Sequence, residues 1–240
     1  MTITQNKTIQ FEDLGTLDYL SAFEYQEKLM QAIIDVKLRN GKNEENEYEI
    51  TNNHFLFVEH PHVYTLGKSG HETNMLINEK KLEEIQATFV KTNRGGDITY
   101  HGFGQIVGYP ILDLDNFKSD IHFYMRNLEE VIIRVIAEYG LKGERSKGET
   151  GVWLDVGTPF ARKICAMGVK TSKWVTMHGF ALNANTDLKY FEYIIPCGIK
   201  DKAVTSLARE LERPLSDEEI VELKAKIKKH FQEVFEAQFI

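Results

Sequence analysis

The sequence predicts an α/β protein in which helices flank a mixed β-sheet. Two observations carry this prediction: three segments have the apolar spacing of helices, and several short β-rich runs lie between them. No repeat, low-complexity stretch or linker divides the 240 residues. We therefore expect one domain over residues 1–240.

The N-terminal half is expected to begin with a long helix and continue with short strands. Residues 17–38 have apolar side chains spaced for one helix face, namely Leu20, Phe23, Met30, Ile33 and Ile34. The polar residues 40–49 predict a loop. After it we expect strands over 54–58 and 63–66 around the turn at Pro61, a short helix over 80–86 and a strand over 88–92.

The second half is expected to alternate strands with two helices. Residues 106–112 predict a strand that lies at a sheet edge or carries a bulge, because Pro110 cannot donate a backbone hydrogen bond. Helical spacing over 120–139 stops at Gly140, a typical C-terminal signal. Three strands are then expected over 152–156, 163–169 and 175–182, and a last helix follows the capping-box pair Ser216 and Glu219.

Composition excludes several classes of protein. A formal net charge of -7 argues against general nucleic-acid binding. No apolar run approaches the ~20 residues that cross a bilayer, and the first ten residues lack the apolar core of a signal peptide. The chain has two cysteines, which suggests no disulfide framework and fits a reducing compartment. We expect a cytoplasmic protein that binds neither nucleic acid nor membrane.

Charge is unevenly spread along this acidic chain. Residues 142–173 hold seven basic side chains and three acidic ones. A basic face could steer an acidic partner, and a chance excess of solvated charges explains the same count equally well.

The densest functional signal is the segment over residues 94–105, RGGDITYHGFGQ. Five of the seventeen glycines lie between Gly95 and Gly108, and glycine allows close approach of a ligand to the backbone. The spacing matches neither a dinucleotide fingerprint nor a phosphate loop. Gly67-Lys68-Ser69 also fails as a phosphate loop, because His62 stands where its first glycine belongs. The sequence thus offers no ATP cradle.

Three further side chains are candidates for chemistry, and a second cysteine is not. Cys197 lies between Pro196 and Gly198, a setting that can expose a sulfur and bring peptide N–H groups near an oxyanion, although most intracellular cysteines are buried and inert. Cys165, in an apolar run, is expected to be inert. Lys163 opens that run and could activate a thiol or act as a base. His178 precedes Gly179 and could support the site. The eight histidines show no metal-binding spacing, so no metal is expected.

Together these segments resemble the lipoyl(octanoyl) transferases of lipoate biosynthesis. The resemblance covers residues 13 to about 207, in the family's order. Its motifs are DLG at 13–15, DY at 18–19, RGGDITYHG at 94–102, GYPILDL at 108–114, TGVW at 150–153, KI at 163–164, MHGFALN at 177–183, PCG at 196–198 and VTSL at 204–207. The chain departs from the family at Phe103, where proline is common, and at the acidic residues 43–49.

The resemblance implies the fold of biotin and lipoate protein ligases, with Cys197 as the nucleophile and Lys163 as the activating lysine. The implied acyl pocket is lined by Arg94, Gly95, Gly96, Asp97, Ile98, Thr99, Tyr100, His101, Ala166, Met167, Gly168, Gly179, Phe180 and Ala181.

The implied reaction moves an octanoyl group from octanoyl-acyl carrier protein to Cys197, and then to a lysine of a lipoyl domain. The implied acceptors are lipoyl domains of 2-oxoacid dehydrogenase acyltransferase subunits and the glycine cleavage H protein, and no cofactor is needed. Three alternatives stay open: an ATP-dependent ligase on the same fold, an amidotransferase that moves octanoate between lipoyl domains, and a catalytically silent carrier-binding module. A cysteine peptidase is disfavoured, because no local signature pairs Cys197 with a histidine.

Overall fold

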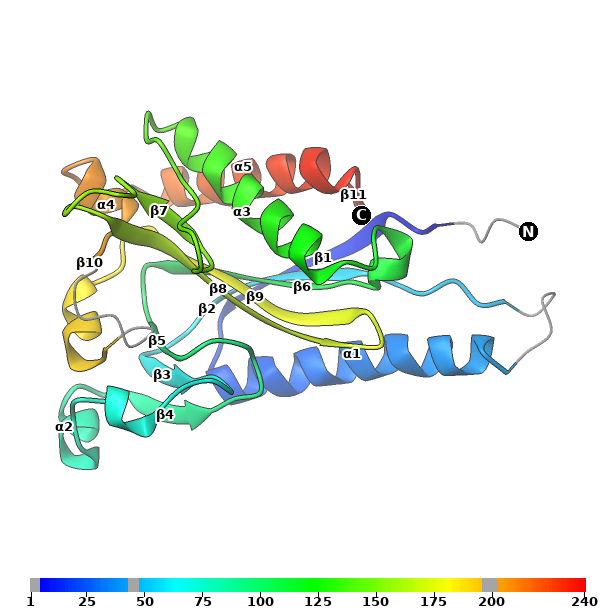
Figure 1. The fold of residues 1–240 in the computed structure, drawn as a ribbon, viewed down its shortest axis with the longest axis horizontal. Coiled ribbons are helices and arrows are strands. Elements are labelled where there is room, and N and C mark those ends of the chain that lie inside the picture. The colour runs from blue at the N-terminus through cyan, green and yellow to red at the C-terminus, as the bar shows by residue number, and fades with distance from the viewer. Residues whose placement is uncertain (1–4, 43–47, 196–202) are drawn as a thin grey trace.

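The computed structural model describes residues 5–42, 48–195 and 203–240, which form three layers with helices on both faces of a mixed sheet (Figure 1). Within these residues the main sheet has eight strands in the order β10-β8-β9-β6-β2-β1-β11, and β7 pairs with β8. The strands are β1 (Thr8–Thr16), β2 (His54–Glu59), β6 (Gln105–Ile111), β7 (Val152–Leu154), β8 (Arg162–Ser172), β9 (Val175–Asn183), β10 (Ala203–Val204) and β11 (Gln238–Phe239).

The sheet is mixed, as predicted. β1 runs parallel to β2 and β11, and β8 runs parallel to β10. The central neighbours β2, β6, β9 and β8 are antiparallel in turn. The antiparallel β8–β9 hairpin thus lies next to β6, and its long strands reach from one end of the sheet to the other (Figure 1).

Long helices cover the two faces of this sheet. α1 (Tyr19–Asn40) covers one face, and α3 (Ile121–Ala137) and α5 (Asp217–Phe235) cover the other (Figure 1). β2 is buried on both faces: Phe55 and Phe57 belong to the core under α3 and α5, and Leu56 and Val58 to the core under α1. This alternation is the period of two that a strand imposes on its side chains.

A smaller sheet packs beside the main one. Its strands β3 (Val63–Leu66), β4 (Thr88–Lys91) and β5 (Ile98–His101) lie in the order β4-β3-β5. The short helices are α2 (Glu79–Glu84), α4 (Leu207–Glu210), η2 (Glu72–Asn74), η3 (Leu114–Asn116) and η4 (Leu188–Tyr193). Aromatic side chains of η4 pack on the smaller sheet, where Tyr190 stacks on Tyr100 with ring centroids 4.9 Å apart.

Two details of the prediction are wrong. Residues 106–112 were expected to lie at a sheet edge or to carry a bulge at Pro110, but β6 is an interior strand between β2 and β9, and its register with β2 continues through Pro110 without a shift. The backbone ladder between β6 and β9 ends at Gly108, opposite Phe180. Further along β9, the Thr176 hydroxyl donates to the Pro110 carbonyl at 2.9 Å and so links the two strands where the ladder has ended. Leu20 is 53% exposed, because the buried stripe of α1 starts at its neighbour Tyr19.

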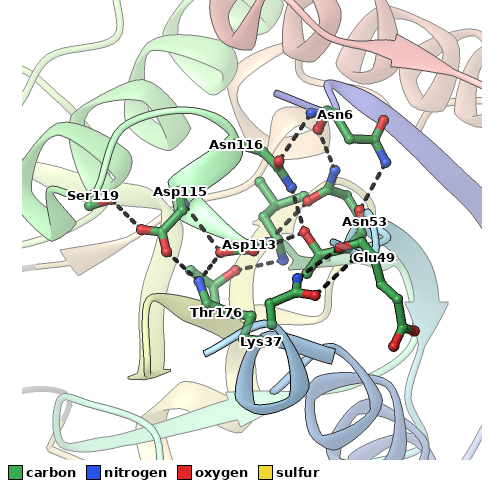
Figure 2. Close-up of polar contacts among 12 residues, drawn as sticks. Asn6, Lys37, Glu49, Asn53, Asp113, Asp115, Asn116, Ser119 and Thr176 are labelled. Atoms are coloured by element: carbon green, nitrogen blue, oxygen red, sulfur yellow. Dashed lines mark hydrogen bonds and ion pairs between the residues drawn. The ribbon is translucent and has the colours of Figure 1, made fainter. Parts of the chain in front are cut away.

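A buried polar network ties the end of α1 to the loop after β6, at the end of the sheet to which α1 points (Figure 2). Lys37 forms ion pairs with Asp113 and Asp115, the second at 2.6 Å. Asp113 is buried, and it also accepts from the Thr51 hydroxyl at 2.8 Å. The network therefore joins α1, the residues before β2 and the loop after β6 around one carboxylate.

We expect Asp113→Ala to lower the free energy of unfolding by about 3 kcal/mol, because it leaves the partners of a buried charge unsatisfied. Asp115→Ala removes the exposed partner of the same lysine and should cost less than about 1 kcal/mol. Urea unfolding of both variants makes the comparison, and equal losses would contradict a special role for the buried carboxylate.

Candidate active site

A cavity of about 80 Å³ opens between the loop that precedes β5 and the β8–β9 hairpin. Most of its lining comes from the loop and β5, from β8 and from β9, and the rest comes from α1, β6, the residue Thr150 before β7, η4 and β10. The lining residues are Tyr19, Arg94, Gly96, Asp97, Ile98, Thr99, His101, Val107, Tyr109, Thr150, Lys163, Ala166, Met167, Gly168, His178, Gly179, Phe180, Ala181, Asn183, Phe191 and Val204. The lining is largely apolar side chains and glycine backbone, which suits a narrow aliphatic ligand.

The loop wall is fastened to both sheets. Arg94 is buried and turns back to β3, where it donates to the Thr65 carbonyl at 2.6 Å. On the other side the Gly95 N–H donates to the Val169 carbonyl of β8 at 2.9 Å. A Cβ on Gly168 would stand 2.9 Å from the Gly95 carbonyl oxygen, so the close approach of loop and strand requires glycine there.

The opposite wall depends on an unusual stretch of β9. His178 has a φ of 60°, in the left-handed region that favours glycine. A Cβ on Gly179 would stand 2.2 Å from the Gly108 carbonyl oxygen, so β6 and β9 approach closely at this point. The His178 ring is held by a 2.9 Å hydrogen bond between Nε2 and the Asn93 side-chain oxygen. The backbone strain is thus fixed beside the cavity, where such strain is often functional.

Three histidines are buried around this wall in their neutral form. Burial lowers the pKa of His60 to about 4, and burial together with nearby charged groups, Arg94 among them, lowers the pKa of His101 and of His178 to about 3. His60 Nε2 lies 2.7 Å from the Tyr109 hydroxyl, and His101 Nδ1 lies 2.8 Å from the Gln105 side-chain oxygen. At neutral pH these rings serve as hydrogen-bonding groups without charge.

These depressed pKa values predict acid sensitivity. Each histidine has an ordinary pKa of about 6.5 in the unfolded chain, which therefore binds more protons than the folded protein between about pH 6.5 and 4. Stability is then full above about pH 6.5 and falls as the pH drops through this window. When the pH falls from 7 to 5, the free energy of unfolding should therefore decrease in both the parent and His60→Gln. We expect the decrease to be about 2 kcal/mol smaller in His60→Gln, as measured by urea unfolding at both pH values. Equal losses would show that His60 titrates normally.

Lys163 stands at the edge of the cavity, at the start of β8. Its ammonium nitrogen lies 4.6 Å from the centre of the Trp153 ring, a cation–π distance. Its backbone pairs with Val204 of β10, which also lines the cavity. The guanidinium group of the adjacent Arg162 donates two hydrogen bonds of 2.6 Å to the Glu210 carboxylate. Of these two basic neighbours, Lys163 lines the cavity and Arg162 does not.

The structure describes Cys165 and does not describe Cys197. Cys165 is fully buried among apolar side chains, and this burial raises the pKa of its thiol well above the ordinary value, so it is inert as expected. Cys197 lies outside the described residues. Its role stays a prediction.

The structure brings most of the predicted pocket together. Of that set, Gly95 and Tyr100 do not line the cavity: the Gly95 backbone bonds to β8, and the Tyr100 hydroxyl lies 2.7 Å from His62 Nδ1 on the other side of β5. Phe103, the departure from the family pattern, is half exposed and packs on His62 outside the cavity.

Some lining residues were missed by the sequence reasoning. Tyr109, Thr150, Asn183 and Val204 all belong to motifs already quoted for the resemblance, so motif membership was the signal that could have found them. Val107 and Phe191 carry no such signal.

The fold and cavity define an α/β domain of the lipoate protein ligase type. A bipartite lipoate protein ligase from Thermoplasma acidophilum shares this fold at a TM-score of 0.65 and 14% identity, covering 98% of this chain and 86% of that one. Lipoate-protein ligase A bound with ATP also has a TM-score of 0.65, at 12% identity, covering 98% of this chain and 87% of that one.

The chain belongs to the lipoyl protein ligase A/B catalytic domain family, whose model matches residues 18–232. It is similar to the octanoyltransferase of Flavobacterium psychrophilum, at 63% identity over 98% of this chain and 100% of that protein. It is also similar to the octanoyltransferase of Parabacteroides distasonis, at 50% identity over 95% of this chain and 99% of that protein. These relatives confirm the predicted family and the predicted class of enzyme, an acyltransferase.

No helix in the described ranges 5–42, 48–195 and 203–240 is both long enough and apolar enough to cross a membrane.

Proposed function

We propose that this chain transfers an octanoyl group from octanoyl-acyl carrier protein, through a thioester on Cys197, to the ε-amine of a lysine on a lipoyl domain. The observation that carries this proposal is the near-full-length similarity, at 63% identity, to a protein named octanoyltransferase. A glycine-walled apolar cavity with Lys163 at its edge supports it.

In the first step Lys163 favours the Cys197 thiolate, which attacks the thioester carbonyl of the donor. The new carbon–sulfur bond forms on Cys197, and the bond to the carrier sulfur breaks. The carrier leaves as a thiol after it takes up a proton. One thioester replaces another, so this step is nearly balanced in free energy.

In the second step the neutral ε-amine of the acceptor lysine attacks the acyl-cysteine carbonyl. An amide forms, the carbon–sulfur bond to Cys197 breaks, and a proton from the amine returns to the sulfur. The amide is more stable than the thioester, so this step is downhill. Neither step consumes ATP or needs a cofactor.

The cavity supplies the binding free energy for the acyl chain. Burial of each CH₂ contributes about 0.8 kcal/mol, so a seven-carbon tail is held without specific polar contacts. Gly96, Gly168 and Gly179 line the cavity, and at Gly168 and Gly179 a Cβ would collide with the carbonyl oxygens of Gly95 and Gly108.

The proposed acceptors are the lipoyl domains of 2-oxoacid dehydrogenase acyltransferase subunits and the glycine cleavage H protein. The similar ligase from Thermoplasma acidophilum is described with its E2 lipoyl domain, which supports this class of acceptor. A cytoplasmic location, expected from the cysteine content, belongs to the same proposal.

The proposal is tested by incubating the protein with octanoyl-acyl carrier protein in the absence of ATP, followed by peptide mass spectrometry. We expect a hydroxylamine-labile octanoyl adduct on Cys197, and transfer to an added lipoyl domain. If a lipoyl domain is modified only when free octanoate and ATP are supplied, the chain is a ligase and the proposal fails.

The predicted docking role of the basic stretch needs revision. Arg145 lies 3.2 Å from Glu129 and 2.7 Å from Glu130 of α3, so its charge is compensated and its reversal would disturb the fold. Lys147 is exposed and precedes the cavity residue Thr150 by three positions.

We therefore expect Lys147→Glu to raise the KM for octanoyl-acyl carrier protein about threefold to tenfold at low salt, and less at high salt, because carrier proteins are acidic. Lys173→Glu is the matched control, because Lys173 lies at the tip of the β8–β9 hairpin, about 16 Å beyond Gly168. Steady-state kinetics measure both KM values. If both variants raise KM equally, the hypothesis that the carrier docks near Thr150 is rejected.

A further inference from the structure

Asn183 lies at the end of β9, directly opposite Gln105 at the start of β6. Both side chains are almost fully buried, and Asn183 also lines the cavity. A buried amide beside a ligand cavity either binds the ligand or holds the protein. The contacts of Asn183 decide between these roles.

Both polar atoms of the Asn183 side chain are engaged by the protein. Its oxygen accepts from the Gln105 amide nitrogen at 2.9 Å, and its nitrogen donates to the Thr205 carbonyl at 2.9 Å. The orientation of Gln105 is fixed in turn, because its nitrogen also faces the Tyr100 carbonyl at 3.3 Å and its oxygen faces His101. The hydrogen bonds therefore run in a fixed order, in which Gln105 donates to Asn183 and Asn183 donates to the Thr205 carbonyl.

Thr205 is in turn bonded to the backbone of Lys163. The Thr205 N–H donates to the Lys163 carbonyl at 2.9 Å, and the preceding residue, Val204, pairs with Lys163 in the β8–β10 ladder. Among the described residues this ladder pairs Ala203 with Arg162 and Val204 with Lys163. Two side-chain bonds add to this short pairing: Asn183 bonds to the Thr205 carbonyl, and the Thr205 hydroxyl donates to Glu210 at 2.5 Å. The bond from Asn183 is the one that comes from a cavity residue.

We propose that Asn183 is a positioning residue for Lys163: it fixes residues 204–205 against the start of β8 and so sets the place of the lysine at the cavity. This inference rests on the proposed role of Lys163. Asn183 is proposed to act through the backbone, because both polar atoms of its side chain bond to other parts of the protein.

A small displacement of Lys163 is enough to matter. Proton transfer and thiol activation require contacts of hydrogen-bond length, and a misplacement of about 1 Å can cost about 100-fold in rate. Asn183→Ala removes the bond to Thr205 and leaves Lys163 itself unchanged. We expect its effect in the rate constant of the chemical step and not in donor binding.

The test is a single-turnover measurement of acyl-enzyme formation from octanoyl-acyl carrier protein. The rate constant for Asn183→Ala should fall 10-fold to 100-fold, while the donor concentration that gives half the maximal rate changes less than threefold. A purely structural role would lower the amplitude, which counts folded molecules, and would leave the rate constant unchanged. That result would overturn the proposal.

Asn185→Ala is the matched control. Asn185 lies two residues further along the chain, outside the cavity, and binds the backbone of Leu215 through both its oxygen and its nitrogen at 2.9 Å. It should lose stability to a similar degree and keep the parent rate constant. An equal fall in rate constant for Asn185→Ala would overturn the assignment to Asn183.

Two further measurements separate this proposal from the function on which it rests. In a Lys163→Met background Asn183→Ala should reduce the rate constant less than twofold, and a full additional loss would show that Asn183 acts elsewhere. Hydrogen exchange at the Thr205 amide needs no activity: Asn183→Ala should accelerate it at least 10-fold, and Asn185→Ala should not. Unchanged exchange refutes the tie, whereas faster exchange in a chain that forms no acyl-enzyme supports the tie and rejects the proposed function.

Discussion

Replacing Cys197 by alanine is expected to abolish the octanoyl-enzyme and to lower kcat/KM for octanoyl transfer by about 10³-fold or more. The reason is that covalent catalysis divides one difficult acyl transfer into two easier steps, and the variant has no nucleophile for the first. Mass spectrometry of the protein after exposure to octanoyl-acyl carrier protein reads the adduct directly. A transfer assay with a lipoyl domain reads the rate.

Cys165→Ala is the control for this experiment. The chain has two cysteines, and Cys165 is buried in the core with a raised thiol pKa. The control should keep both adduct and transfer, at a modest cost in stability from the lost sulfur. An adduct that survives in Cys197→Ala, or transfer at the parent rate, would reject the thioester route.

The long helices could be predicted because their signals are local, whereas the four-residue helix α4 was not predicted. α3 starts at Asp120, whose side chain accepts from the Phe123 N–H, and α5 starts at Ser216 with the complete capping box. The apolar stripes between these caps and the helix ends are legible in the sequence. By contrast β1, β5, β10 and β11 were not predicted. The alternation of apolar and polar residues in β1 covers only Ile9 to Glu12, and β10 and β11 are two residues long.

The site was predictable in content and unpredictable in geometry. The glycine-rich segment and Lys163 stand out in the sequence because their motifs keep the family's order. The close approaches that shape the cavity join Gly95 to Gly168 and Gly108 to Gly179, and each pair is separated by more than seventy positions. The ion-pair partners of charged residues could not be predicted from the sequence either: Arg145 lies in the basic stretch 142–173, and its pairing with Glu129 of α3 appears only in the structure.

The second large effect is expected at Lys163. Lys163→Met preserves much of the aliphatic stem and removes the ammonium group, and we expect the rate constant of acyl-enzyme formation to fall about 10²-fold to 10⁴-fold. The physical reason is that the thiolate loses its stabilising charge and the reaction loses a group that can exchange a proton. Stopped-flow mixing with octanoyl-acyl carrier protein measures this rate constant, and KM for the donor should change little.

Two companions define what the lysine does. Lys163→Arg keeps a positive charge above the Trp153 ring but cannot give up its proton at neutral pH. If Lys163 exchanges a proton with the thiol or the leaving group, the arginine variant should be nearly as slow as the methionine variant; if it supplies charge alone, most of the rate should return. Lys170→Met, on the same strand but outside the cavity, should keep the parent rate. A parent-like rate for Lys163→Met would remove the lysine from the mechanism and leave activation of Cys197 to another group.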